Sequence, residues 1–290
     1  MQRDLALTLA GGGNRAFYQT GLLNRWGERL LPRLRVVSAC SAGACVAALH
    51  FAQRSLETGA FWRRRRDGVV RNVDVMRLLR RQPIAPHGEV YRDTMIFAMQ
   101  EGGLERLRAL PFPLLVLTAG LPGWTPTPLA VLLGIAAYNL EKRIAPDRVH
   151  PRFGRWLGFD PVVYDARDCE TPDALADLVL ASSATPPFTP VGRIGGRRLL
   201  DGGMVDNVPA FLADGFPGVR RHLVVLTRPY PAGVLGRHGQ RLYVGPRSPT
   251  PVSRWDYTRP DLVDATIAMG EKDTEFHGPA LESLLVRLEG

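Results

Sequence analysis

The sequence has few cysteines, and their pattern limits what the protein can be. Only Cys40, Cys45 and Cys169 occur among its 290 residues. An odd number gives no complete disulfide framework, and the spacing matches no zinc site. We therefore expect neither a disulfide scaffold nor a bound metal or other cofactor, and a reducing compartment fits this composition best.

Long hydrophobic runs are also missing. The longest, residues 128–137, is too short to cross a bilayer as a helix. Residues 1–9 lack the basic-then-apolar order of a signal peptide. These absences predict a cytoplasmic protein without a transmembrane helix, whose contact with a membrane would be peripheral.

Lysine is rare in a chain that is otherwise rich in positive charge. Of the 37 Lys and Arg residues only Lys142 and Lys272 are lysine, and the formal net charge is +9. This balance favours an anionic partner such as nucleic acid, a membrane surface or an acidic substrate, although coding bias gives the same balance without any partner. The densest charge, residues 63–66, follows Phe61 and Trp62, which suits a lipid headgroup layer as well as a solvated face.

One serine lies in a pattern of strand, tight turn and helix. The β-branched residues 34–37 predict a strand, and the Ala-rich residues 44–49 predict a helix. Between them, Ser41 has only the small residues Ala39 and Gly43 two positions away. Such a nucleophile elbow projects the serine Oγ atom from a strained turn, where bulky neighbours would collide. Ser41 is thus either a nucleophile or merely the N-cap of the helix.

Three consecutive glycines, residues 11–13, connect a predicted strand at 5–10 to a predicted helix at 16–30. A glycine loop at a helix N-terminus offers free backbone N–H groups, which suit either a phosphate or the oxyanion of acyl transfer. Together with Ala16 the glycines also satisfy a dinucleotide-binding pattern. That pattern requires an acidic residue after the second strand, and residues 38–43 contain none.

An aspartate lies at the end of a later strand. Asp201 follows the predicted strand 197–200 and precedes Gly202 and Gly203. Aspartates in such turns often only cap the backbone. The two glycines equally allow the carboxylate to approach a nucleophile at the end of another strand.

Taken in this order, the three motifs resemble those of the patatin-like phospholipases. The resemblance also includes a small, proline-rich block at 181–190 and the sequence Asp-Asn-Val-Pro at 206–209, and it covers roughly residues 5–50 and 160–230. Ala39 and Ala16 replace glycines of the family pattern. A methyl group at either position is accommodated by a slight backbone shift or narrows the oxyanion hole.

The resemblance implies specific roles for residues of this chain. Ser41 would be the nucleophile and Asp201 its base, in a catalytic dyad. The backbone of Gly11, Gly12 and Gly13 would hold the oxyanion. The supporting residues implied by the same motifs are Asn14, Arg15, Gly43, Gly202 and Gly203.

The fold implied is α/β, a three-layer α/β/α sandwich with a central, mostly parallel sheet and a helical cap insertion. Residues 1–290 would form one domain, with the cap at about 59–113 and a C-terminal helical extension at about 255–290. Within the cap, hydrophobic periodicity predicts helices at 73–81 and 90–99.

A further strand is predicted at 114–119 and an apolar helix at 129–144. Both segments would line an acyl pocket or form ordinary core.

The activity implied is hydrolysis of carboxylic esters in phospholipids, lysophospholipids or neutral lipids. Two alternatives stay open. One is a weak or inactive relative that acts as a basic membrane- or nucleic-acid-binding protein, although no nucleic-acid motif accompanies the charge. The other is an α/β-hydrolase esterase with His222, His238 or His277 as base. That fold places several strands before its elbow, and only one fits before Ser41.

Overall fold

A nine-stranded mixed sheet forms the centre of the protein, whose computed structural model describes residues 3–286. Its five inner strands are parallel and lie in the order β3, β2, β1, β7, β9. They are β1 (Leu5–Leu9), β2 (Leu34–Cys40), β3 (Leu114–Gly120), β7 (Arg221–Val225) and β9 (Arg241–Val244). Continuous apolar runs such as β1 are typical of parallel strands that are buried on both faces.

The outer strands are antiparallel to their neighbours. β4 (Asp160–Asp165) and β6 (Arg197–Asp201) both pair with β3, whereas β5 (Gly192–Ile194) extends β6 and β8 (Gly236–His238) extends β9.

β2 and β6 share one edge of β3, because β4 occupies the opposite edge from Leu115 to Gly120. β2 pairs with β3 as far as Cys40, which lies opposite Leu117. β6 pairs with the next part of β3, and its last residue Asp201 lies opposite Thr118. The C-terminal ends of β2 and β6 therefore meet on this edge.

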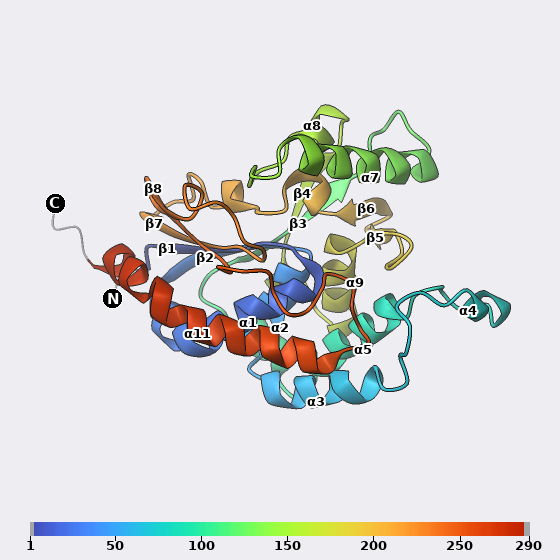
Figure 1. The fold of residues 1–290 in the computed structure, drawn as a ribbon, viewed down its shortest axis with the longest axis horizontal. Coiled ribbons are helices and arrows are strands. Elements are labelled where there is room, and N and C mark those ends of the chain that lie inside the picture. The colour runs from blue at the N-terminus through green and yellow to red at the C-terminus, as the bar shows by residue number, and fades with distance from the viewer. Residues whose placement is uncertain (1–2, 287–290) are drawn as a thin grey trace.

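Helices cover both faces of the sheet (Figure 1). One face carries α1 (Phe17–Leu30), α2 (Ala42–Ala52), α9 (Pro172–Ser182) and α11 (Pro260–Leu285). The other face carries α7 (Thr127–Ile144), α8 (Phe153–Trp156) and α10 (Gly203–Asp206). This arrangement confirms the predicted three-layer α/β/α class.

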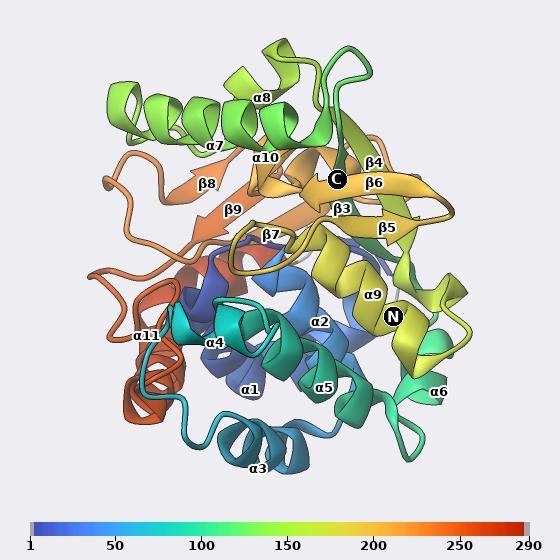
Figure 2. The same ribbon diagram turned by 90° about the vertical axis from the view of Figure 1, so that its right-hand side faces the viewer.

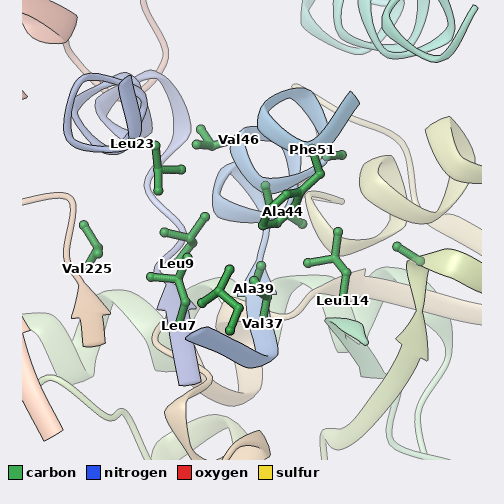
Figure 3. Close-up of a cluster of buried hydrophobic side chains, with 14 of the residues drawn as sticks. Leu7, Leu9, Leu23, Val37, Ala39, Ala44, Val46, Phe51, Leu114 and Val225 are labelled. Atoms are coloured by element: carbon green, nitrogen blue, oxygen red, sulfur yellow. The ribbon is translucent and has the colours of Figure 1, made fainter. Parts of the chain in front are cut away.

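The main core lies between the sheet and the layer that contains α1 and α2. Leu7, Leu9 and Val37 of the strands approach Leu23 of α1 and Val46 of α2 (Figure 3). Removing these side chains from water supplies much of the driving force for folding. The core thereby fixes the strand ends on which the candidate site is built.

The segment between α2 and β3 is helical and includes α3 (Ser55–Arg65), α4 (Met76–Leu79), α5 (His87–Met99) and α6 (Gly103–Arg108). α5 and α3 lie outside α1 and α2, and α5 also packs on α9 (Figure 2). None of the helices within residues 3–286 is long and apolar enough to cross a membrane.

The helix predicted at 90–99 is confirmed by α5, but the one predicted at 73–81 is shortened to α4. The carboxylate of Asp74 accepts the Met76 N–H at 3.0 Å, which starts the helix late. Arg81 has a φ of 55°, which ends it early. Local polar bonding therefore overrode the apolar periodicity there.

Candidate active site

Ser41 lies in the turn between β2 and α2, in a backbone conformation that non-glycine residues seldom adopt. Its φ is 53° and its ψ is −131°, and its side chain makes no capping bond to the helix. Instead, Oγ donates to Oδ2 of Asp201 at 2.8 Å. Strain of this kind is typical of functional positions. Although Ser41 directly precedes α2, its hydroxyl therefore does not cap the helix.

Neighbouring groups hold the turn in place. The Ser41 N–H donates to Oγ of Ser182 at 2.8 Å, and that hydroxyl donates to the Leu117 carbonyl at 2.6 Å. Gly43 lies against the backbone of β1, where an added Cβ would overlap the Leu9 carbonyl oxygen. Glycine is therefore required at position 43, two residues after the serine, because α2 approaches β1 closely there.

Asp201 divides its two carboxylate oxygens between structure and the serine. Oδ1 accepts the Gly203 N–H at 2.7 Å, which is the turn-capping role. Oδ2 accepts from Ser41, and also from Oγ1 of Thr185 at 3.2 Å. Burial raises the pKa of the Asp201 carboxyl, while Arg254 and the hydrogen bonds partly offset this effect. Asp201 therefore both caps its turn and contacts the Ser41 hydroxyl, with one oxygen for each.

The glycine loop lies directly beside Ser41. The Gly11 N–H is taken by the Asn207 carbonyl at 2.9 Å, and the Gly11 carbonyl accepts from Asn207 Nδ2 at 2.9 Å and Thr227 Oγ1 at 2.7 Å. Within residues 3–286, the N–H groups of Gly12 and Gly13 have no such partner. Of the three predicted glycines, Gly11 thus anchors the loop. Gly12 and Gly13 keep backbone N–H groups that can donate to a ligand.

The supporting residues of the motif fix the loop from its other end. Arg15 Nε donates to the Gly12 carbonyl at 3.2 Å. Asn14 Nδ2 donates to the Asp256 carbonyl at 2.6 Å. The two alanines that depart from the family pattern, Ala16 and Ala39, both belong to the main buried core, so packing accommodates their methyl groups.

A largely apolar cavity opens beside Ser41 and contains about 1290 Å³ of empty space, part of it continuous with solvent. Its walls come from α1, α2, α3, α5 and the chain from Arg254 to Ile267. Its larger apolar side chains include Phe17, Leu23, Val46, Leu49, Trp62, Trp255, Val263 and Ile267. Neither β3 nor α7 lines this cavity. Of the two alternatives left open for 114–119 and 129–144, the structure shows ordinary core for residues of both segments, among them Leu117, Ala119 and Ala130.

The histidines considered as alternative bases lie elsewhere. His222 is buried with Nε2 at 2.6 Å from Thr8 Oγ1, and burial lowers its pKa to about 4. His277 Nε2 bonds the Gly245 carbonyl at 2.9 Å, and His238 is exposed on β8. Among the residues described, no histidine bonds Ser41 or Asp201. A Ser-Asp-His arrangement is therefore not formed.

Residues 3–286 contain no group of three or more His, Cys, Asp or Glu side chains placed to hold a metal ion.

Sequence reasoning missed several residues of this site. Ser182 and Thr185 lie in the block at 181–190, and Asn207 lies in the block at 206–209, so the sequence located these segments without assigning their contacts. Thr227 and Arg254 carried no sequence signal, because their roles depend on which strand ends and loops meet.

Comparison with known proteins places this chain in a family. The model of the patatin-like phospholipase family matches residues 7–214, and the chain belongs to that family. Among solved structures, it is similar to VipD from Legionella pneumophila, with 13% identity, 93% of this chain and 67% of that chain covered, and a TM-score of 0.38. No curated protein sequence matches it significantly.

Proposed function

We propose that this protein is a serine lipid acyl hydrolase that cleaves carboxylic esters through the dyad of Ser41 and Asp201. The observation that carries the proposal is the 2.8 Å hydrogen bond between Ser41 Oγ and Asp201 Oδ2, beside an apolar cavity and two free backbone donors. Membership of the patatin-like phospholipase family supports lipid esters as the substrate class.

In the first half-reaction, Asp201 accepts the hydroxyl proton while Ser41 Oγ bonds to the ester carbonyl carbon. The N–H groups of Gly12 and Gly13 stabilise the oxyanion that forms. When the intermediate collapses, the bond to the alcohol oxygen breaks, and the alcohol leaves with the proton held by Asp201. The acyl group is then esterified to Ser41.

In the second half-reaction, a water molecule gives a proton to Asp201 and attacks the acyl carbonyl carbon. The second oxyanion uses the same donors. Its collapse releases the carboxylic acid and returns the proton to Ser41. A carboxylate is a weaker base than imidazole, so oxygen esters are better substrates than amides. Burial assists the step, because it raises the pKa of the Asp201 carboxyl.

The formed dyad argues against an inactive binding protein, and the paired arginines argue against a nucleic-acid surface at residues 63–66. Arg63 forms an ion pair with Asp264, and Arg65 pairs with Asp93 at 2.6 Å. Phe61 stacks on Phe97 with ring centroids 4.3 Å apart, so this aromatic side chain packs on the protein.

We infer that any peripheral membrane contact involves the segment around α4 instead. Val70 is 81% exposed and precedes the exposed Arg71, and Leu79 is 77% exposed and precedes the exposed pair at 80–81. α4 extends away from the sheet at the end of the cap (Figure 1). Exposed apolar side chains flanked by arginines are suited to an anionic lipid surface.

This segment is connected to the cavity beside Ser41. The Asn72 side-chain oxygen accepts the Tyr257 N–H at 2.8 Å, and Tyr257 lines that cavity. A lipid taken from a surface at α4 would therefore be close to the cavity wall.

The decisive test of the hydrolase is turnover of p-nitrophenyl butyrate by wild type, Ser41→Ala, Asp201→Asn and the control Ser253→Ala, whose serine is exposed. The first two variants should fall to background while their melting temperatures stay near wild type, and the control should retain full activity. Turnover by Ser41→Ala at the wild-type rate would refute the assignment.

A further inference from the structure

A second cavity lies next to the glycine loop, and its lining includes four cations and two tyrosines. It contains about 520 Å³ of empty space, part of it continuous with solvent. Its charged and aromatic lining comprises Arg15, Tyr138, Glu141, Lys142, Arg148, Arg228 and Tyr230. Arg254 reaches the same group of side chains, since its Nη1 donates to the Tyr138 hydroxyl at 3.2 Å.

Four of these cations lack a carboxylate partner. Among residues 3–286, none of Arg15, Lys142, Arg228 and Arg254 has a carboxylate oxygen within 4.0 Å. The acid at this cavity, Glu141, is already occupied. It pairs with Arg148 at 2.6 Å and accepts further bonds from two backbone N–H groups.

The four side chains contact carbonyl groups and aromatic rings. Arg228 donates to the Pro146 carbonyl at 2.6 Å and lies 4.0 Å from the centre of the Tyr230 ring. Lys142 Nζ lies 4.4 Å from the centre of the Tyr138 ring. The Nε atom of Arg254 is buried and has no hydrogen-bond partner among the described residues. These contacts hold the cations in position without neutralising them.

Half-buried charges of the same sign that lie near one another destabilise the folded protein unless an anion binds between them. For Lys142, burial lowers the pKa of the ammonium group, and the positive charges of Arg254 and Arg15 lower it further. Arginine and lysine together are also the side chains that bind phosphate oxygens best. The cavity therefore has the composition of an anion site.

The site is directly connected to the catalytic groups. Arg15 donates to the Gly12 carbonyl, and the N–H of the same glycine is one of the proposed oxyanion donors. Arg254 also lines the apolar cavity, and its charge lowers the pKa of Asp201 against the effect of burial. An anion held here would lie next to the glycine loop.

We propose that Arg15, Lys142, Arg228 and Arg254 bind the phosphate of the substrate, so that the protein prefers acyl esters with a phosphomonoester headgroup. This proposal rests on the proposed hydrolase activity. Four cations match a dianion better than a singly charged phosphodiester. Choline or ethanolamine would bring a further positive charge. Glu141 is already paired, and Lys142 and Arg228 already lie over the rings of Tyr138 and Tyr230. Zwitterionic headgroups are therefore disfavoured.

The test compares three soluble short-chain substrates at constant ionic strength: a monoacylglycerol 3-phosphate, the matching monoacyl glycerophosphocholine and the matching monoacylglycerol. We expect wild type to favour the phosphomonoester in kcat/KM by about tenfold or more over each of the others, since even one charged hydrogen bond to the phosphate changes binding by about that factor. Lys142→Ala and Arg228→Gln should each reduce this ratio about tenfold, mainly through KM. Lys272→Ala, which removes the other, exposed lysine, should leave the ratio unchanged.

Calorimetric titration with inorganic phosphate separates this proposal from the hydrolase itself, because binding needs no turnover. Phosphate should bind wild type and Lys272→Ala, and binding should be lost in Lys142→Ala with an unchanged melting temperature. If phosphate binds but the three substrates are turned over equally, the cavity takes a free anion and the headgroup proposal is refuted. If no phosphate binds, the anion site itself is refuted. Absence of turnover with every ester would instead refute the hydrolase.

Discussion

The hydroxyl of Ser41 donates to Asp201 at 2.8 Å although 160 positions separate the two residues in the chain. They meet because β2 and β6 pair with consecutive parts of the same edge of β3, from opposite directions. Asp201, the last residue of β6, thus meets Ser41, which directly follows β2. The two side chains are held on strand ends inside the core, which makes their geometry rigid.

Replacing each histidine in turn tests whether a histidine or Asp201 is the base that accepts the Ser41 proton. We expect His222→Ala, His238→Ala and His277→Ala each to keep activity on p-nitrophenyl butyrate within about tenfold of wild type, because none touches the dyad. Asp201→Asn should remain at background, because a neutral amide cannot accept the proton. If one histidine variant with unchanged circular dichroism fell as far as Ser41→Ala, imidazole would be the base.

The raised pKa of Asp201 predicts opposite effects of pH on activity and on stability. Activity should be lost on acidification through that pKa, because the base is then protonated. The folded-state pKa lies above the unfolded value of 3.8, so the native state binds the proton more tightly, and the contribution of Asp201 to stability decreases as pH rises through this window.

Asp201→Asn removes the titration, so its melting temperature relative to wild type should increase between about pH 4 and pH 7. Thermal unfolding at both pH values measures this difference. A difference that decreased towards neutral pH would mean that the carboxylate is stabilised by its surroundings, contrary to the effect of burial.

Gly12→Ala should disable the oxyanion loop by steric overlap. Gly12 has an extended backbone, but an added Cβ would overlap the side chain of Thr227, which holds Gly11 in place. We expect kcat to fall about 100-fold or more, the usual cost of losing an oxyanion donor. The matched control is Gly123→Ala, whose added Cβ meets no atom within 4 Å. Equal activity of both variants would show that the loop donors do not act.

Vesicle binding should depend on the exposed apolar residues around α4. In sedimentation with vesicles that contain anionic lipid, we expect Leu79→Ser to bind several-fold more weakly than wild type, because burying this side chain contributes about 1.5–3 kcal/mol. Leu56→Ser, which removes an equally exposed leucine from α3, should bind like wild type. Binding should weaken as salt rises. Equal loss in both variants, or none in either, would place the contact elsewhere.

The local pattern of the sequence determined the elements that carry the site. The strand, turn and helix around Ser41, the glycine loop at 11–13 and the turn at Asp201 are each set by neighbours in the chain: small residues where backbones approach closely, and apolar runs where strands are buried. The three-layer fold was implied by the resemblance of these motifs to the patatin-like phospholipases.

Only the tertiary structure decided which distant groups meet. The order of strands brings Asp201 to the end of β2, and the contact of Thr227 with Gly11 requires β7 to lie beside β1. The same applies to the cavity beside Ser41, which is built from α1, α2, α3, α5 and the chain from Arg254 to Ile267. The sequence left open whether the apolar helix at 129–144 lines a pocket or forms ordinary core. Periodicity reports which face of a helix is buried, but it does not report the surface against which that face packs. The unpaired cations show the same limit, since Arg15, Lys142, Arg228 and Arg254 are far apart in the chain and become neighbours only where their segments converge on the glycine loop.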